Sequence, residues 1–264
     1  MHSMTQPRPE EEIQVRHCAS LEEYDECVRL EHIVWGEEIA VPSALFVVAH
    51  HTGGQVLGAF AGARMVGFTL ALAGVRSGVP FLHSHMTAVL PEYRDRGVAR
   101  RLKLLQREDA LARGIQLIEW TFDPLELKNA HFNLVRLGAI ARRFIPNCYG
   151  ITQSPLHGGL PTDRLVAEWW LGSDRVKSIL AGRAAPVCGS SVRISLPANL
   201  EEMKSADLAA AEQIQSEARE QFQKWFAGGY VATAIEDRGD RRDYILEPAG
   251  AIAGLSLSGA AEKS

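Results

Sequence analysis

Four arginines and one glycine lie close together in the segment "VLPEYRDRGVARRL", residues 89–102, between an expected strand and an expected helix. The first N–H groups of a helix have no acceptor within the helix, and together with the helix dipole they attract anions. Gly97 lacks a side chain, so a ligand can approach the backbone closely there. Arg94, Arg96 and Arg100 add charge-assisted hydrogen-bond donors. The segment therefore predicts a turn that holds a pyrophosphate.

The charge pattern alone fits a second interpretation equally well, a solvated basic helix start whose arginines pair with Glu108 and Asp109. The order of elements favours the first interpretation: a strand, Pro-Glu-Tyr, Arg-x-x-Gly-x-Ala, an amphipathic helix and another strand. This order resembles the acetyl-CoA-binding motif of the GNAT superfamily of N-acyltransferases. The motif is formed here by Arg94, Asp95, Arg96, Gly97, Val98 and Ala99.

The resemblance covers about residues 13–171. Within it, "LHSHMTAVLPEYRDRG", "TFDPLELKNAHFNLVRLGA" and "NCYG" are similar to a branch of predicted acyltransferases with a C-terminal extension. It implies an α/β fold with a mixed central sheet that splays after the fourth strand and is flanked by helices. It also implies that the pantetheine arm of CoA enters the splay, while the pyrophosphate rests on the arginine–glycine turn. Backbone groups of Thr87, Ala88 and Val89 would then bind the pantetheine like an added strand.

Asn129 and Asn133 lie one helical turn apart and share a face of the next expected helix. In GNAT proteins an asparagine near the start of this helix can bind the pantetheine. The match is shifted in register here, and exposed or capping amides are the alternative. Both asparagines are therefore predicted CoA contacts by resemblance alone.

N-acylation requires an amine to attack the thioester carbonyl, a base to remove a proton and, in some enzymes, an acid to protonate the thiolate. His83 and His85 lie on the strand before the turn, and strand alternation places them on one face. By resemblance, His83 stands where several members have a glutamate base, and histidine titrates near neutrality. The alternative is that both are hydrogen-bonded histidines lining the sheet.

The general acid is less defined, because Leu134 occupies the position at which many members carry a tyrosine. Tyr149 in "NCYG" is the predicted substitute, and a packed aromatic with a satisfied hydroxyl is the alternative. Asp123 and Glu126 end the next strand and could hold a substrate ammonium. Asp123 could equally cap the following helix, with Pro124 at its first position.

The elements that position these residues follow from hydrophobic periodicity. Strand, helix, strand, helix and strand alternate over residues 81–149, which indicates an α/β unit. The expected organisation is a disordered tail (1–12), a GNAT-like domain (13–171) and a C-terminal β-α-β-β extension (172–264) that packs on the acceptor side. Within the domain, the strand "LVAEWWL" places Trp169 and Trp170 on opposite faces, one of them in the core. A single loop is expected over residues 74–80.

Composition narrows the functional classes. The formal net charge of −4 argues against a broad nucleic-acid or membrane surface, and the four cysteines form no CxxC pair that would suggest zinc. No signal peptide or membrane span is expected. The sequence thus predicts a cytoplasmic acetyl-CoA-dependent N-acyltransferase, without a metal, that acts on a small amine or amino acid in a ternary complex. A silent acyl-CoA-binding module and an aminoacyl-tRNA-dependent transferase are the alternatives, and a homodimer remains open.

Overall fold

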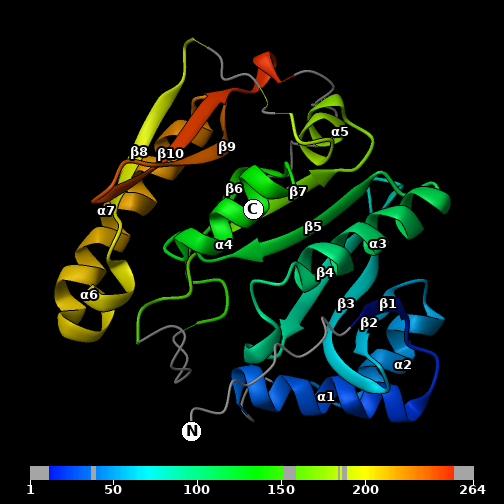
Figure 1. Ribbon diagram of the computed structural model, residues 1–264. Coiled ribbons are helices and arrows are strands. Elements are labelled where there is room, and N and C mark those ends of the chain that lie inside the picture. The colour runs from blue at the N-terminus through cyan, green and yellow to red at the C-terminus, as the bar shows by residue number, and fades with distance from the viewer. Residues whose placement is uncertain (1–11, 37–39, 151–158, 184, 186–188, 253–264) are drawn as a thin grey trace, which may run out of the picture. The chain divides into compact units, whose positions relative to one another are not determined.

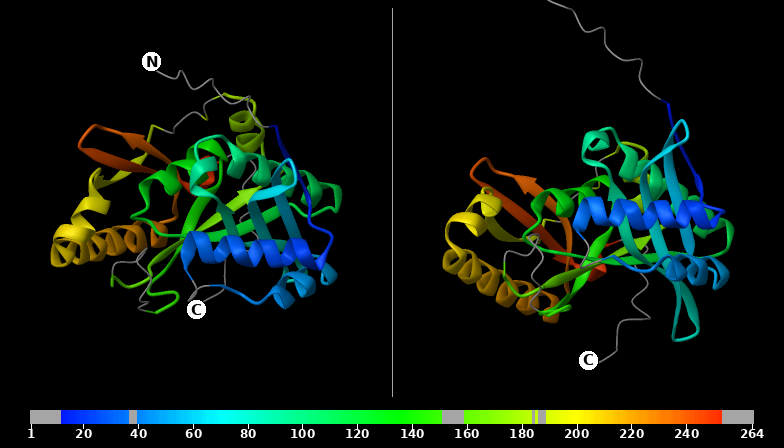
Figure 2. Two further views of the ribbon diagram at one scale, coloured as in Figure 1. Left: turned by 60° about the horizontal axis from the view of Figure 1, so that its bottom comes forward. Right: turned by 90° about the horizontal axis from the view of Figure 1, so that it is seen from below.

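The computed structural model describes residues 12–36, 40–150, 159–183, 185 and 189–252 (Figures 1 and 2). All but one residue of the predicted N-terminal tail therefore lies outside the described residues. The chain forms two compact units. Unit 1 comprises Met1–Ala73 and Ser84–Asp109, and unit 2 comprises Gly74–His83 and Ala110–Ser264. The divisions fall inside two strands and one helix, which contribute to both units.

Unit 1 contains a sheet in the order β1-β2-β3-β4. Its strands are β1 (Ile13–His17), β2 (Gln55–Ala61), β3 (Arg64–Arg76) and β4 (Val79–Val89). β2 pairs antiparallel with both β1 and β3, and Gly62 at φ 58° makes the tight turn between β2 and β3. The prediction of a single loop over residues 74–80 is wrong, because β3 continues to Arg76. The turn needs only Ser77 and Gly78, both with positive φ, as a tight hairpin requires.

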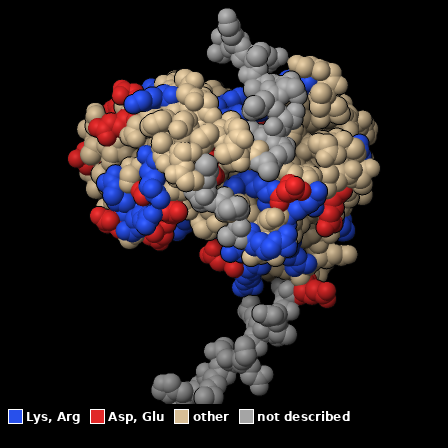
Figure 3. All heavy atoms as spheres, turned by 90° about the horizontal axis from the view of Figure 1, so that it is seen from above, with Lys and Arg blue, Asp and Glu red and all other residues tan. Residues whose placement is uncertain are grey.

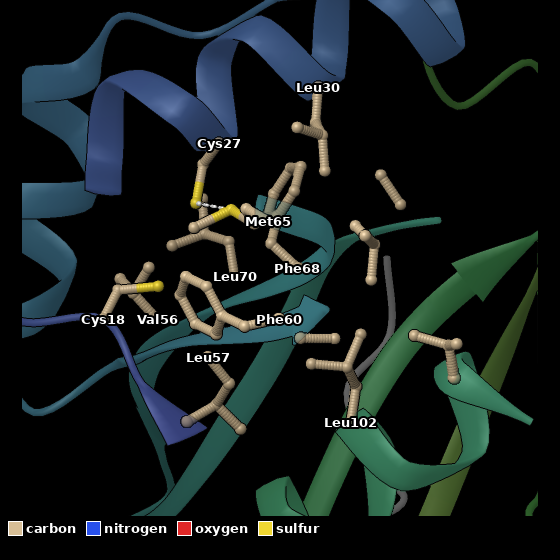
Figure 4. Close-up of a cluster of buried hydrophobic side chains, with 14 of the residues drawn as sticks. Cys18, Cys27, Leu30, Val56, Leu57, Phe60, Met65, Phe68, Leu70 and Leu102 are labelled. Carbon is tan, nitrogen blue, oxygen red and sulfur yellow. Dashed lines mark hydrogen bonds between the residues drawn. The ribbon is translucent and has the colours of Figure 1, made fainter. Parts of the chain in front are cut away.

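The helices of unit 1 are α1 (Leu21–Trp35), α2 (Ser43–His51) and α3 (Val98–Ala112), and the 3-10 turn η2 (Pro91–Tyr93) precedes α3. The Ser20 side chain accepts a hydrogen bond from Glu23 N and caps the beginning of α1. Figure 4 shows Cys27 and Leu30 of α1, Phe68 of β3 and Leu102 of α3 in one apolar cluster. This buried packing fixes α3, and with it the turn that starts the helix.

Unit 2 contains strands in the order β4-β5-β7-β6-β9-β10-β8. The bounds are β5 (Leu117–Phe122), β6 (Ile140–Ile145), β7 (Arg164–Trp170), β8 (Val192–Pro197), β9 (Tyr230–Asp237) and β10 (Arg241–Pro248). β4 and β5 pair in parallel through two residue pairs, Leu82 with Ile118 and His83 with Glu119. The other neighbouring strands of this unit pair antiparallel. The short parallel pairing agrees with the splay that the resemblance implies.

The helical elements of unit 2 are α4 (Leu127–His131), the π-helical η3 (Phe132–Arg136), α5 (Asp174–Leu180), α6 (Leu200–Ala206), α7 (Leu208–Ala227) and η4 (Ala249–Ala251). The helix expected to begin at Pro124 begins instead at Leu127, although Asp123 does accept a hydrogen bond from Leu125 N. Trp169 is buried and donates to Leu137 O, whereas Trp170 is half-buried, so the expected opposite orientation is confirmed.

The C-terminal part of the chain continues the sheet of unit 2, because β6 pairs with β9 at Ala141 and Ala232. Helix α7 packs against β6, β8 and β9. Phe222 of α7 stacks on Phe144 of β6 at 6.0 Å and meets the edge of Tyr244 of β10 at 5.0 Å. Aromatic packing of this kind anchors α7 on the sheet.

The predicted fold class, a mixed sheet flanked by helices with a further β-α-β-β segment, is confirmed. None of the helices in the described ranges combines the length and the apolar character that crossing a bilayer demands.

Candidate active site

The turn between β4 and α3 is held in place by its backbone. Leu90 N donates to Val66 O of β3 at 2.9 Å, and Arg94 N donates to Pro91 O at 3.2 Å. Asp95 and Gly97 then adopt positive φ values of 60° and 74°. Such values are open to glycine and tolerated by aspartate. The resulting reversal ends at the N-terminus of α3, where the free N–H groups of the first turn lie.

The side chains of this turn face solvent from Arg94 to Gly97, whereas the next residue, Val98, is buried. Arg94 Nε donates to Val89 O at 3.3 Å, and the Arg96 guanidinium lies 5.1 Å from the centre of the Tyr93 ring. A β-carbon built on Gly97 would meet no atom within 4 Å, so the space beside this backbone is open. The turn therefore combines exposed guanidinium groups with open space beside the Gly97 backbone.

Asp109, one of the two carboxylates in the alternative interpretation of the turn, has partners elsewhere in unit 1. It accepts a hydrogen bond from Gln55 Nε2 at 2.5 Å and lies 3.6 Å from His17 Nε2. Arg101 donates to Ile13 O of β1 and so anchors the first turn of α3. Arg100 is half-buried at the same end of the helix.

The last residues of β4 lead directly into this turn. Burial alternates along them, with Ala88 buried and Thr87 and Val89 half-buried. Thr87 Oγ1 lies 2.9 Å from Thr69 Oγ1 of β3, which fixes the side chain. A β-carbon at position 67 would lie 2.8 Å from Ala88 O, so glycine is required there. β3 thus holds the segment that the resemblance predicts to bind pantetheine.

The two candidate bases occupy one face of β4, opposite the buried Ser84. His85 lies in unit 1 and is exposed, yet neighbouring atoms remove part of its hydration and lower its pKa below the ordinary histidine value. His83 is half-buried in unit 2 and is the parallel-strand partner of Glu119. Ser84 hydroxyl accepts a hydrogen bond from buried Lys103 Nζ at 2.6 Å.

The two asparagines do share a helix face, as their spacing predicts. Asn133 is buried, Asn129 is exposed, and Asn133 Nδ2 donates to Asn129 Oδ1 at 3.4 Å. Asn133 lies in the π-helical turn, and its carbonyl accepts from Ala139 N. Leu134, at the position of the usual tyrosine, is fully buried.

Tyr149 is 53% exposed, which leaves its hydroxyl available at the surface of unit 2. The hydroxyl lies 2.9 Å from Thr121 Oγ1, and the Arg164 guanidinium lies 5.5 Å from the ring centre. Tyr149 N donates a hydrogen bond to Thr162 Oγ1, and Cys148 N donates one to Thr162 O. These two hydrogen bonds fix the loop. Its role as an acid stays a prediction.

Asp123 and Glu126 already share a cation. Lys204 Nζ lies 3.0 Å from Glu126 Oε1 and 3.7 Å from Asp123 Oδ2, and Arg164 lies 3.8 Å from Asp123. Burial raises the pKa of Asp123 above its usual value, although Lys204 opposes this shift. A substrate ammonium at these carboxylates would therefore have to displace Lys204.

Unit 2 contains a cluster of charged residues that the sequence did not predict. Glu119 of β5 and Glu168 of β7 are buried cross-strand partners; Glu119 binds Arg76 of β3, and Glu168 binds Arg142 of β6. A single carboxylate inside an otherwise apolar strand, as in "LIEWTF" and "LVAEWW", is the signal that marks them. The partners could not be named, because they depend on the pairing of distant strands.

Comparisons with known proteins identify relatives by structure alone. No protein-family model matches the chain, and no curated protein matches it in sequence. The ribosomal-protein-S18-alanine N-acetyltransferase from Escherichia coli is 12% identical, with a TM-score of 0.49, and the match covers 60% of this chain and 92% of that one. A GNAT-family acetyltransferase from Streptococcus pneumoniae is 15% identical, with a TM-score of 0.47 and coverages of 60% and 98%.

An Arabidopsis thaliana protein in complex with a bisubstrate analogue that contains CoA is 14% identical, with a TM-score of 0.49 and coverages of 59% and 97%. Likenesses at these identities and TM-scores carry no function over, so the residues of this chain must support any assignment. The mixed sheet, the short β4–β5 pairing after the fourth strand and the arginine–glycine turn at the start of α3 agree with the features that the resemblance implies. The chain has a GNAT-like fold.

Proposed function

We propose that the protein is an acyl-CoA-dependent N-acyltransferase that transfers an acyl group, by preference acetyl, to the amine of a small molecule or amino acid. The amine attacks the thioester directly in a ternary complex. The observation that carries the proposal is the open turn from Arg94 to Gly97. Exposed guanidinium groups, positive φ values and the N-terminus of a 15-residue helix meet there. These features together suit a diphosphate.

The main proposed CoA contacts lie at the turn of unit 1 and in the strand residues that precede it. Main-chain N–H groups near Gly97 and the guanidinium groups of Arg94, Arg96 and Arg100 would bind the pyrophosphate, and the backbone of residues 87–89 would bind the pantetheine. Asn129 and Asn133 are further proposed contacts. When bound, an acyl-CoA supplies an activated thioester carbonyl.

The protein's own contribution to the chemistry is proton transfer and positioning. His83 is the preferred base and His85 the second candidate. A lowered pKa keeps the His85 imidazole neutral at pH 7 and therefore able to accept a proton. The Tyr149 hydroxyl is the proposed acid, and Asp123 with Glu126 is a proposed ammonium site that opens when Lys204 moves.

The first test is calorimetric titration of the full chain with CoA. Replacement of both exposed arginines, Arg94→Ala with Arg96→Ala, should weaken CoA binding roughly tenfold or more, because each donates charge-assisted hydrogen bonds. A matched control removes two other exposed cations, Arg29 and Lys177, which pair with carboxylates of their own helices. Unchanged affinity in the first variant would refute the phosphate-binding turn.

Turnover separates the enzyme from a silent acyl-CoA-binding module. Release of free thiol from acetyl-CoA is followed with a panel of amines, and amine-dependent release supports the transferase. CoA binding without turnover of any amine would favour the module.

An aminoacyl-tRNA-dependent transferase needs a broad basic surface. Figure 3 shows Lys and Arg side chains interspersed with Asp and Glu on the face drawn, and the net charge is −4. This alternative predicts salt-sensitive retention of tRNA by the full chain. No retention in a salt series starting near 50 mM would exclude it.

A further inference from the structure

Five charged side chains form a cluster in unit 2 that the function proposed above does not use. Glu119 of β5 and Glu168 of β7 lie side by side, and their side chains are only 4% and 2% exposed. Two adjacent buried carboxylates repel each other and lose hydration, so cations must compensate them. Arg76, Arg142 and Arg143 provide these cations.

The contacts hold the three guanidinium groups in fixed orientations. Arg76 binds Glu119 through two parallel contacts of 2.7 and 2.9 Å, and Arg142 binds Glu168 through two contacts of 3.0 Å. Arg143 joins the two carboxylates, with Nη2 on Glu119 and Nε 3.4 Å from Glu168 Oε1. Forked pairs of this geometry restrict a guanidinium group strongly.

The outer side of this cluster carries hydrogen-bond donors. Within these five side chains three cations face two carboxylates, an excess of one positive charge. The carboxylates lie underneath, whereas the side chains of Arg76 and Arg143 are 31% and 41% exposed. Arg142 Nη1 also lacks a hydrogen-bond partner among the residues that the structure describes, but it is buried, so the exposed donors are those of Arg76 and Arg143. Since guanidinium groups donate and cannot accept, this surface suits an anion.

The cluster lies beside His83. In the parallel pair of β4 and β5, His83 is the partner of Glu119. Paired residues on strands about 4.8 Å apart project from the same face of a sheet. The imidazole proposed as the base and the three guanidinium groups therefore share one face of unit 2.

We propose that Arg76, Arg142 and Arg143 bind a carboxylate of the acceptor, so that its amine is presented to His83. The acceptors are then amino acids or other amines that carry a carboxylate. A carboxylate fits better than a phosphate, because it is planar and its single negative charge matches the single excess positive charge. This inference rests on the proposed N-acyltransferase function for the role of the amine, but the anion subsite can be measured without turnover.

Direct binding is the first arm of the test. Ligand-observed NMR titrations of the full chain compare N-acetyl-β-alanine with its primary amide, which replaces the charged carboxylate by a neutral group of similar size and shape. The carboxylate should bind roughly tenfold tighter or more. Equal affinities would overturn the subsite, and tighter binding of inorganic phosphate would overturn the assignment to carboxylates.

The second arm changes Arg143, because Arg76 and Arg142 still compensate the carboxylates when it is removed. Arg143→Gln should abolish the preference for the carboxylate probe, and Arg143→Lys should restore part of it, since lysine keeps the charge but not the fork. Arg238→Gln is the matched control. Arg238 also joins two carboxylates, at 2.6 and 3.7 Å, and is 53% exposed. A preference that survives in both Arg143 variants would overturn the proposal.

The third arm links the subsite to catalysis through kcat/KM for β-alanine and for β-alaninamide with acetyl-CoA. A roughly ten- to hundredfold preference for β-alanine, lost in Arg143→Gln, is expected. Calorimetric titration with CoA distinguishes failure of the proposed N-acyltransferase function from failure of the carboxylate subsite. A chain that binds the carboxylate probe but not CoA retains the subsite and loses the proposed function. A chain that binds CoA without preferring the carboxylate loses the subsite alone.

Discussion

Lys103 is a buried ammonium group whose replacement should reshape the pH dependence of stability. It lies on α3 with its side chain directed to Ser84 Oγ at 2.6 Å and to Gln106 Oε1 at 3.2 Å. Its residue is only 4% exposed, and burial lowers its pKa from 10.5 to about 7. The change to test is Lys103→Met, which keeps the unbranched stem and removes the charge.

The magnitude follows from the pKa difference between the folded and unfolded chains. A lowered pKa in the folded state means that the unfolded chain binds more protons between about pH 7 and 10.5, so stability rises with pH across that window. The full shift of 3.5 units, from 10.5 to about 7, corresponds to about 5 kcal/mol. Between pH 7 and pH 9 the free energy of unfolding should increase by about 2 kcal/mol.

The variant should lack this increase. At pH 7 it should be the more stable protein, by about 2 kcal/mol once about 1 kcal/mol is subtracted for each of the two lost hydrogen bonds. Near pH 10 the order should reverse, because the charge penalty in the wild type has nearly vanished. Urea unfolding at half-unit pH steps from 7 to 10 measures both curves. If the free energies of unfolding of the wild type and the variant change with pH in parallel, the argument from the buried charge of Lys103 is refuted.

Three further predictions concern the turn, the base and a buried ion pair. Gly97→Ala should cost about 1–2 kcal/mol of stability, because φ is 74°, and should weaken CoA binding in calorimetry by filling the open space. Unchanged CoA affinity would contradict the open-turn argument. His83→Ala should lower kcat/KM far more than CoA affinity and flatten the neutral limb of its pH profile, and an unaltered profile would remove His83 from the base role. Arg219→Ala leaves the buried Asp163 carboxylate without its bidentate partner at 2.9 and 3.0 Å. The loss should be about 3 kcal/mol in urea unfolding, and a change below 0.5 kcal/mol would contradict it.

The sequence predicts the GNAT-like elements well where local signals agree. The strand ending at Val89, the turn and α3 combine alternation, a proline, a glycine and a helical apolar stripe, and each appears within a few residues of its expected position. Short helices such as α5 and α6 were missed, because seven residues give little periodicity and tertiary packing stabilises them.

The site residues also fall into those whose environment follows from local sequence and those whose partners are distant in the chain. Exposure of Arg94 to Gly97 follows from local sequence, whereas the pairing of Lys204 with Glu126 joins residues 78 positions apart. The same is true of the Arg143 contacts, which depend on a register shift between Ala141 and Arg143 in β6. An irregularity of this kind redirects side chains and has no signature in a single sequence.

The pairing of β6 with β9 has a consequence for how the molecule avoids unwanted association. A chain that stopped at residue 171 would leave β6 as the border of its sheet, with open main-chain groups along "IARRFI". In the full chain that border passes to β8, which carries Arg193 and ends in Pro197. A charged side chain and a proline on a border strand discourage edge-to-edge pairing with a strand of another molecule. The C-terminal strands thus cover the edge of β6 and protect it from pairing with other molecules. A chain shortened to residue 171 should therefore aggregate.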